Sequence, residues 1–583
     1  MPKNWQILAK IEDDFLEQYP QYDRLTLQLL KNRGLTEKTE IEEFLGADYE
    51  TNSHDPFLFK NMRAAVDLII AKIKAKEKIT VYGDYDADGV TSTALMMETL
   101  TTLKAKVGIY IPDRVSEGYG LNNAAVKEIY DSGTKLLITV DNGIRGKTEV
   151  AYAKSLGLEV IVTDHHLAPN EAGDLPDCLV IDPIMTNDSY PFKYLAGVGT
   201  AFKLAAALIR SSSLSPEDKI KLEERNLDLV AIGTVADCVK LLGENRVLVK
   251  RGLEVLNRTK RLGILELIKA AKINNGKLLD SWNIGFQLAP RLNAAGRMDH
   301  ANTAFELIIT KDKAEAEQLA RDLSGKNSDR QRETELIVEQ IENNIKGGLK
   351  EKIIIAVSPS IYGGKEQWNE GVIGLAAGRL MEKYYLPVIV ITGDASEMKG
   401  SGRSIPEFNL MTGIEKVRRT LTRYGGHAAA CGFSIESKKN LEQFIAELKV
   451  LANEALTGSE LHRETTVDAE IDFSEIDDQL IEIIDRFAPF GEENSRPKFL
   501  CRNLLVVDLI NLGSDGRHLK LRVKNGQAGV KSALGFGQTG RWPDLRIGDK
   551  IDLVFYPEIN EFNGKREIQL KIVDLEQAES TNA

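Results

Sequence analysis

The sequence predicts an α/β protein in which two α/β lobes are joined by a long helix and followed by a small C-terminal β-barrel. Three observations support this fold class. Short apolar segments alternate with helical patterns from about residue 56 to 240, a second pattern of strand, helix and strand begins at residue 353, and short strands separated by Gly and Asn turns follow residue 465. Because 583 residues are too many for one hydrophobic core, we expect several domains.

Five regions are expected along the chain. The first is polar and helical in pattern and carries no recognisable chemistry, and the third is highly charged with apolar residues at helical spacing. The expected boundaries are 1–55 for a helical N-terminal cap, 56–310 for the first α/β domain with a parallel sheet, 311–346 for the connecting helix, 347–462 for the second α/β domain, and 463–576 for a barrel of the oligonucleotide-binding (OB) type.

Composition is that of a soluble globular protein, with 43% hydrophobic and 28% charged residues. No apolar run is long enough to span a bilayer, and the N-terminal residues lack the layout of a signal peptide, so we expect no membrane association and a cytoplasmic location. The four cysteines are far apart and form no C-x-x-C pair, which argues against a zinc ribbon or a disulfide framework.

The net charge of −12 argues against a surface coated with basic residues for duplex DNA. The C-terminal segment has the opposite charge balance: from Arg496 to Lys571 it contains fourteen Lys and Arg residues and eight Asp and Glu residues. This local excess fits a groove that follows a single nucleic-acid strand. The candidates for base stacking are Phe536, Trp542, Phe555 and Tyr556, although a place in the barrel core is the simpler interpretation of any one of them.

The segment Val81–Ser92 carries the strongest chemical signal in the first lobe. It places Asp84, Asp86 and Asp88 directly after the apolar run 79–82, and a helical pattern follows from Gly89. Carboxylates this close together must be protonated or neutralised by a cation. The carboxyl end of a strand next to the amino end of a helix is also where open α/β sheets bind ligands. The segment therefore predicts a metal site.

Further candidate ligands follow later segments of the same lobe. Apolar strands are expected at 79–82, 106–111, 136–140, 159–162 and 179–181, and parallel strands bring their carboxyl ends to one edge of a sheet. Polar residues follow these segments and the apolar segment 231–236; they are Asp141 and Asn142, then Asp164, His165 and His166, and finally Asp237. Taken singly, each motif has a structural explanation as a turn, a surface pair or a helix cap. Their conjunction favours two ions, and oxygen and imidazole ligands without thiolates favour manganese or magnesium over structural zinc.

The second lobe and two other segments contain candidate anion-binding groups. Gly400–Ser404 and Gly425–Gly432 combine small residues, which let backbone N–H groups approach an anion, with Ser, Arg and His donors. Arg114 lies in an expected surface loop, and residues 290–300 form an expected small-residue loop with Arg291, Asn293 and Arg297. Each of these segments alone is weak evidence for a site.

Four ordered motifs resemble those of the DHH phosphoesterase superfamily: Gly-Asp-Tyr-Asp-Ala-Asp-Gly, Val-Asp-Asn-Gly, Thr-Asp-His-His and Thr-Val-Ala-Asp. Over nearly its whole length the chain is similar to the single-strand-specific 5′→3′ DNA exonucleases of that superfamily. The resemblance implies a DHH catalytic domain, a DHH-associated substrate domain and an OB-type domain. It also implies hydrolysis of single-stranded DNA from the 5′ end by two manganese or magnesium ions, in recombination and repair.

The resemblance assigns roles to individual residues. The implied metal ligands are Asp84, Asp86, Asp88, Asp141 as the bridge, His165 and Asp237. The implied catalytic residues are His166 and His427, near the cleaved bond, and Asp164, which orients its neighbours. The implied substrate-binding residues are Arg114, Arg297, Ser401, Arg403, Gly425 and Gly426. The sequence departs from the common pattern at Tyr82, Asn142 and Asn369, where relatives often carry other residues, and these three receive no role.

The implied partners are single-stranded DNA, a single-strand-binding protein and a helicase, and we expect a monomer. Two alternatives remain. One is a DHH phosphodiesterase of short oligonucleotides or cyclic dinucleotides, which the basic C-terminal barrel disfavours. The other is a non-catalytic single-strand DNA-binding scaffold, which the complete set of implied metal ligands disfavours.

Overall fold

The computed structural model describes residues 4–169, 171–273, 276–346, 348–349, 351–458, 461, 463–513, 516–527, 529–562 and 564–578. These residues divide into two compact units, one within 1–53, 238–251 and 464–583 and the other within 54–237 and 252–463. The expected domain boundaries at 347 and 462 lie outside the described residues. Among the described residues, no helix has the length and apolar character that crossing a membrane requires.

The first lobe of the larger unit contains a five-stranded, entirely parallel sheet in the order β3-β2-β4-β5-β6. Its strands are β2 (Lys78–Tyr82), β3 (Lys106–Tyr110), β4 (Thr134–Val140), β5 (Glu159–Thr163) and β6 (Leu179–Ile181). The central strands are apolar along their length because helices cover both faces of the sheet. The expected α/β fold class is confirmed, and all five strands expected here are present.

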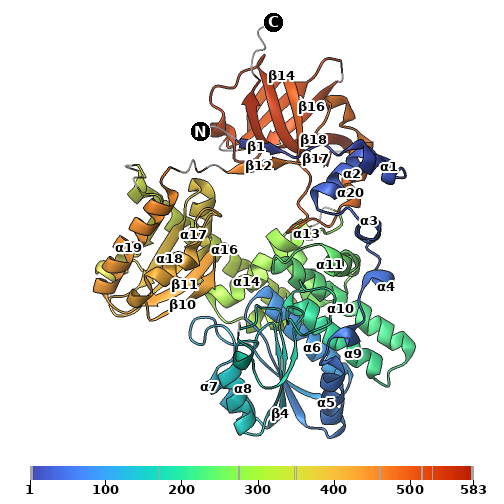
Figure 1. Ribbon diagram of the computed structural model, residues 1–583, viewed down its shortest axis with the longest axis vertical. Coiled ribbons are helices and arrows are strands. Elements are labelled where there is room, and N and C mark those ends of the chain that lie inside the picture. The colour runs from blue at the N-terminus through green and yellow to red at the C-terminus, as the bar shows by residue number, and fades with distance from the viewer. Residues whose placement is uncertain are drawn as a thin grey trace. The chain divides into compact units, whose positions relative to one another are not determined.

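Helices α7 (Asn123–Asp131) and α8 (Lys147–Ser155) cover one face of this sheet, and α5 (Met62–Lys74) lies on the other (Figure 1). Two more helices, α6 (Ala87–Thr102) and α9 (Gly197–Ser211), pack against each other and against the sheet. Both begin at the carboxyl-terminal edge of the strands, so their N-termini face the loops that carry the acidic motifs.

A helical layer follows the sheet in the chain. It contains α10 (Pro216–Ala236), α12 (Leu262–Ala270), α13 (Ser281–Asn283), the π-helical turn η3 (Ile284–Leu288), α14 (Ala289–Met298) and α15 (Asn302–Ile309). One expectation was wrong here, because residues 290–297 belong to helix α14 rather than to a loop. The apolar segment 231–236 is the last part of helix α10. Packing against α6 and α16 favours helix over a loop for these Ala-rich segments.

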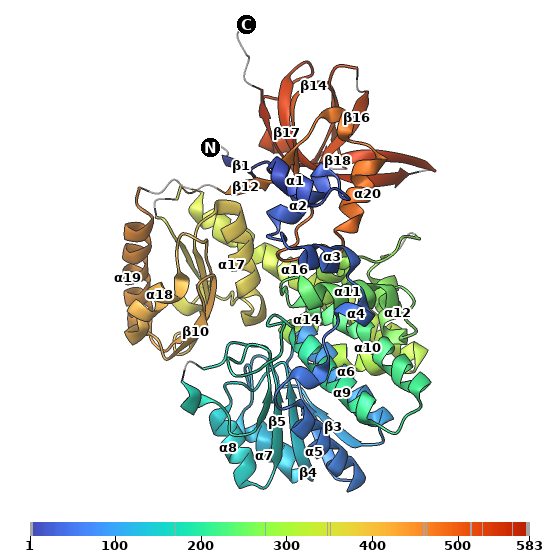
Figure 2. The same ribbon diagram turned by 45° about the vertical axis from the view of Figure 1, so that its right-hand side comes forward.

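The expected long helix is α16 (Lys313–Ile345), which Asp312 caps by accepting a hydrogen bond from Glu315 N at 2.8 Å. The second lobe follows it, with the sheet order β10-β11-β9-β8-β7. Its strands are β7 (Ile354–Val357), β8 (Val388–Gly393), β9 (Met398–Arg403), β10 (Arg423–His427) and β11 (Ala430–Ile435). Helix α17 (Glu370–Tyr384) covers one face, and α18 (Leu410–Lys416) and α19 (Lys438–Leu456) cover the other (Figure 2).

The glycine-rich motifs of the second lobe lie on strands rather than in open loops. Ser401 pairs with Val390 on β8 and with Gly432 on β11, and Gly425 of β10 pairs with the same Gly432. The glycines permit tight packing between strands, since a Cβ at Gly400 would lie 2.1 Å from the Phe433 ring. Ser401 and Arg403 are two residues apart on β9, so their side chains point to the same face of the sheet.

The smaller unit is built around a closed barrel, in which β14 (Phe499–Leu512) pairs with both β15 (His518–Lys524) and β17 (Lys550–Phe562). Strand β16 (Val530–Gly535) pairs with β15, and β18 (Lys565–Gln577) pairs with both β16 and β17, which closes the barrel. This confirms the expected OB-type barrel. Phe555 is part of its core, whereas Phe536 is 57% exposed and lies under the Lys571 ammonium at 4.1 Å.

The N-terminal segment shares one hydrophobic core with this barrel. Helices α2 (Arg24–Asn32) and α3 (Lys38–Gly46) contribute Leu27 and Phe44 to the core that contains Phe499. Strand β1 (Asn4–Ile7) pairs in parallel with β12 (Glu464–Val467). The two ends of the chain thus fold together, which no local pattern in the sequence predicts.

The Arg246 side chain connects three segments of the smaller unit. It is 1% exposed, lies over the Phe44 ring, and donates to the carbonyl oxygens of Phe44 at 2.9 Å, Phe487 at 2.8 Å and Arg486 at 3.1 Å. Arg246→Met should destabilise this unit by about 3 kcal/mol, because buried carbonyls lose their donors. Urea unfolding followed by tryptophan fluorescence measures the loss, with the exposed Arg24→Met as control; equal midpoints would contradict the prediction.

Candidate metal and phosphate site

The turn from β2 into α6 places the first three carboxylates. Asp86 is the N-cap of α6, and its Oδ1 accepts from the backbone N–H groups of Asp88 at 2.9 Å and Gly89 at 3.0 Å. Asp88 lies in the first helical turn, where it accepts from the N–H groups of Gly197 at 2.7 Å and Val198 at 2.9 Å. The N-termini of α6 and α9 thus both stabilise negative charge at this point.

Asp141 follows β4 in a left-handed backbone conformation with a φ of +64° and is 2% exposed. Its amide donates to Thr163 O at 3.1 Å, so the end of β5 holds the turn after β4 in place. Asp237, the C-cap of α10, reaches the same place from the end of a helix. The two carboxylates therefore come from different layers of the lobe.

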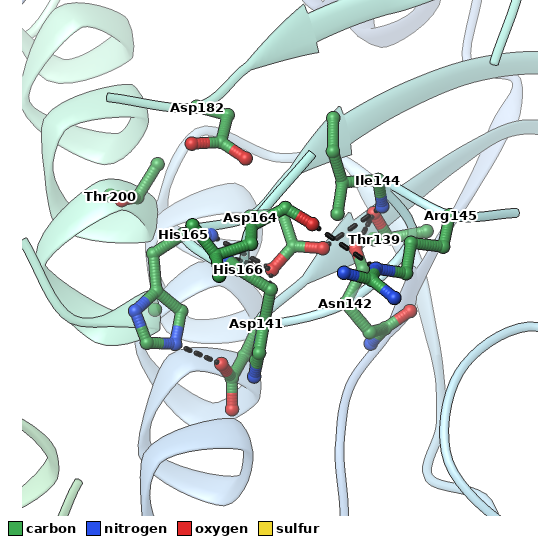
Figure 3. A network of polar contacts seen from close by, with 12 residues as sticks. Thr139, Asp141, Asn142, Ile144, Arg145, Asp164, His165, His166, Asp182 and Thr200 are labelled. Carbon is green, nitrogen blue, oxygen red and sulfur yellow. Dashed lines mark hydrogen bonds and ion pairs between the residues drawn. The ribbon is translucent and has the colours of Figure 1, made fainter. Parts of the chain in front are cut away.

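His165 lies among three of these carboxylates. Its Nε2 is 3.1 Å from Asp141 Oδ1, 3.6 Å from Asp237 Oδ2 and 3.9 Å from Asp88 Oδ2, and Figure 3 shows it pointing at Asp141. Burial lowers the pKa of His165 to about 4, which keeps the imidazole neutral and able to bind a metal. Three overlapping groups have ligand atoms within 4.8 Å of one another: Asp84, Asp86 and Asp141; Asp88, His165 and Asp237; and Asp141, His165 and His166.

The electrostatics of this centre call for a cation. Burial and mutual repulsion raise the pKa values of Asp84, Asp141 and Asp237 well above the usual range, and they raise that of Asp88 to about 7. Asp84 Oδ1 is buried without a hydrogen-bond partner among the described residues. A set of oxygen and imidazole donors fits manganese or magnesium, and the sharing of Asp141 between groups fits two ions.

Asp164 organises the residues beside this centre and is not itself a member of any candidate ion group. Its Oδ1 accepts from His166 Nδ1 at 2.8 Å and from the amide of His165 at 2.8 Å, and its Oδ2 accepts from Ile144 N at 2.9 Å (Figure 3). The pKa of Asp164 is lowered because bonds and charge from His166 outweigh burial, and Asp164 in turn raises the pKa of His166. His166 therefore holds its proton more tightly than a free histidine.

Arginines gather beside the acidic centre. Burial and the positive charges of Arg114, Arg330 and Arg403 lower the pKa of Arg297 to about 9, so these guanidinium groups are close enough to repel one another. Arg114 stacks on Tyr85 at 4.1 Å, and Arg403 Nη1 lies 3.3 Å from Ser401 Oγ. Guanidinium groups crowded together in this way are suited to bind a phosphate group.

The sequence-predicted residues do not all join these two groups. His427 is exposed at the end of β10, where its Nδ1 accepts from Ala429 N at 3.3 Å. Within the described ranges, no hydrogen bond or ion pair connects His427, Gly425 or Gly426 to the carboxylates or to the arginines. Their roles remain predictions.

Several contributors to the site were not predicted from the sequence. The Tyr119 hydroxyl lies 2.9 Å from His166 Nδ1, and Gly197 leaves room for Asp141. Asn293, one of the candidate anion-binding residues, instead fixes the start of α6, where its Oδ1 accepts from Ala87 N at 2.7 Å. Tyr119 lies in a Gly-Tyr-Gly sequence, which is typical of an exposed loop with an aromatic side chain. This pattern was the only sequence indication that Tyr119 could contribute to the site. Arg330, on the charged helix α16, lies close enough for its charge to lower the pKa of Arg297.

The three residues that depart from the common pattern have structural partners. Tyr82 donates to Gly120 O at 2.9 Å, and Asn142 donates to Val140 O at 2.9 Å. Asn369 is the N-cap of α17 and accepts from Gly371 N at 2.8 Å. None of them belongs to a candidate ion group, so the ligand set stays complete without them.

Asp182 is fully buried behind Asp164, and its Oδ2 has no hydrogen-bond partner among the described residues. Burial and the charge of Asp164 raise its pKa to about 8. The folded state therefore binds the Asp182 proton more tightly than the unfolded state. As the pH rises from about 4 to about 8, Asp182 lowers the free energy of unfolding by about 1.4 kcal/mol for each pH unit. Asp182→Asn removes this loss.

The melting temperature of Asp182→Asn in EDTA should thus exceed that of the wild type by an amount that grows from pH 5 to pH 8. The exposed Asp177→Asn, in a surface ion pair with Lys154, should follow the wild type throughout. A constant difference between Asp182→Asn and the wild type across this range would show that Asp182 does not titrate as inferred.

The parallel sheet, the clustered carboxylates and the adjacent arginines define a phosphoesterase of the DHH type, and the family model "DHH family, N-terminal domain" matches residues 78–234. The models "DHHA1 domain" and "RecJ OB domain" match residues 350–454 and 467–574. The chain belongs to the RecJ family. It is 38% identical over 555 residues to the single-stranded-DNA-specific exonuclease RecJ of Bacillus subtilis, covering 94% of this chain and 67% of that protein.

Further relatives agree with this assignment. RecJ of Salmonella typhimurium is 35% identical over 541 residues, covering 88% of this chain and 89% of that protein. The crystal structure of RecJ from Thermus thermophilus in complex with Mn²⁺ matches with a TM-score of 0.82 and 28% identity, covering 99% of this chain and 80% of that one. A structure of the Thermus thermophilus protein with Mg²⁺ matches with a TM-score of 0.77 and 26% identity, covering 99% of this chain and 79% of that one.

Proposed function

We propose that this chain is a single-stranded-DNA-specific exonuclease that hydrolyses phosphodiester bonds from the 5′ end with two manganese or magnesium ions. The observation that carries the proposal is the convergence of six implied metal ligands on one buried centre, beside a cluster of arginines. Membership of the RecJ family supports the substrate, because the curated relatives are named single-stranded-DNA-specific exonucleases. Both alternatives from the sequence lose support, since the OB domain and the metal ligands are present together.

When bound, two divalent ions supply the positive charge that activates water and neutralises the charge developing on the phosphate oxygens. Asp84 and Asp86 would hold one ion, Asp88, His165 and Asp237 would hold the other, and Asp141 would contact both. His166 carries a proton held by Asp164, so the imidazolium can donate to a phosphate oxygen in the transition state. The chain thus contributes ligands, orientation and one proton donor.

We infer that the arginine cluster determines polarity. A terminal 5′ phosphate carries more negative charge than an internal phosphodiester, so Arg114, Arg297 and Arg403 with Ser401 would bind it preferentially. The barrel would bind the strand nonspecifically through its basic side chains and through exposed aromatic groups such as Phe536. We further propose a cytoplasmic monomer that acts in recombination and repair with a single-strand-binding protein and a helicase.

Digestion of a long single strand labelled separately at its 5′ and 3′ ends tests this function. With Mn²⁺ we expect early loss of the 5′ label as a small product, no such loss from duplex, and no cleavage in EDTA or by Asp141→Ala. Early release of the 3′ label would refute the polarity. Survival of the strand with hydrolysis of dinucleotides would favour the oligonucleotide phosphodiesterase, and binding without cleavage would favour a scaffold.

A further inference from the structure

A cavity of about 590 Å³ lies in the helical layer of the first lobe, lined by residues of α6, α10 and α12 and by the end of α15. Its volume is within the range of roughly 300–1,000 Å³ that small-molecule sites occupy. Glu98 of α6 lines it and is ten residues beyond Asp88 on the same helix, which places it about 15 Å from the acidic centre. The cavity is therefore separate from the proposed active site.

Arg261 forms one wall of this cavity and is 6% exposed. Its Nε donates to Asp228 at 2.9 Å and its Nη1 donates to Glu98 at 2.6 Å, but its Nη2 is buried without a partner among the described residues. An unsatisfied buried guanidinium nitrogen costs free energy unless an acceptor enters the cavity. A hydrogen-bond acceptor of a ligand in the cavity would satisfy Arg261 Nη2.

The remaining charge around the cavity is positive. Arg225 also pairs with Glu98 at 2.9 Å, and Arg258 pairs with Glu224 at 2.6 Å, so each lining carboxylate has a cationic partner. Lys260 and Lys311 line the cavity, and neither forms an ion pair within the described ranges. A bound anion would therefore meet unneutralised positive charge.

The amino end of helix α12 adds backbone donors. Leu262 begins this nine-residue helix and lines the cavity, and the side chain of the N-cap residue, Arg261, makes no capping hydrogen bond. Unpaired N–H groups at a helix N-terminus are well suited to a phosphate. Val255, Ile308 and Ile309 also line the cavity, so it offers apolar contacts as well as basic groups.

We propose that this cavity binds a nucleoside monophosphate, with the phosphate on Arg261, the N-terminus of α12 and the two lysines, and the base against the apolar wall. The size, the unpartnered guanidinium nitrogen and a lining that combines unpaired lysines with apolar side chains carry the proposal. It goes beyond the exonuclease function and does not depend on it.

Equilibrium dialysis of radiolabelled dTMP and AMP against the full-length protein in EDTA tests the site. The exposed pair Lys260→Glu/Lys311→Glu should bind one nucleotide fewer per chain, or bind it at least tenfold more weakly. The matched control Lys106→Glu/Lys135→Glu, on exposed strand residues outside the cavity, should match the wild type. Arg403→Ala, in the proposed phosphate pocket, should retain the binding that the lysine pair removes.

Competition with inorganic phosphate and with thymidine resolves the chemistry of the ligand. Weak displacement by either alone and strong displacement by unlabelled dTMP would support a nucleotide site, whereas phosphate competing as well as dTMP would refute it. Identical binding by the wild type and Lys260→Glu/Lys311→Glu would also overturn the proposal. Strand cleavage by this variant, measured in parallel, should equal that of the wild type, which separates this result from any failure of the exonuclease function.

Discussion

Asp141→Asn is expected to reduce manganese-dependent hydrolysis of single-stranded DNA on the order of 10³-fold while raising the melting temperature of the ion-free protein. Asp141 is buried and belongs to two of the three candidate ion groups. Its pKa is raised by burial and by Asp88, Asp86 and Asp237, so the ion-free protein carries repulsion that an amide relieves. Activity and stability should therefore change in opposite directions.

Initial rates of 5′ label release and thermal melts in EDTA measure the two effects on the same preparations. Asp177→Asn, whose carboxylate is 95% exposed, removes a charge far from any candidate ion group and should leave both quantities near wild type. A variant at position 141 that is inactive and also less stable would indicate a structural role for Asp141 instead of a role as ligand.

Gly197→Ala should lower activity by about 100-fold and weaken the affinity for manganese without unfolding the lobe. A Cβ at this position would lie 2.4 Å from Asp141 Oδ1 and 2.6 Å from its Cβ, so Asp141 must move out of place. The backbone of Gly197 is not in the left-handed region, and alanine favours the first turn of α9, so the helix itself should tolerate the change.

Gly199→Ala provides a matched control two residues along the same helix. Its Cβ would meet only the flexible side chain of Leu195, at 3.3 Å, and we expect activity within a few-fold of wild type. Manganese titrations monitored by cleavage rate compare the two variants. Equal activity of Gly197→Ala and Gly199→Ala would show that the position of Asp141 does not limit the reaction.

The sequence by itself determined the sheet and most of the acidic centre. Asp84, Asp86, Asp88 and Asp141 follow apolar strands, and parallel strands deliver their carboxyl ends to one edge whatever the rest of the chain does. The five strands of the barrel were also readable, because alternation of apolar residues between Gly and Asn turns is a local pattern. Local patterns were sufficient wherever the structure depends on neighbours in the chain.

Only the tertiary structure decided the contributions that come from distant segments. Asp237 reaches the centre from helix α10, the N–H groups of Gly197 and Val198 bind Asp88, and Arg246 joins α3 to the chain around Phe487. The same holds for Ser401 and Arg403, which lie on a strand because cross-strand partners satisfy their backbone groups. Each depends on packing between residues far apart in sequence, where the free energy of burial overrides the weak local preference of Ala- and Gly-rich segments.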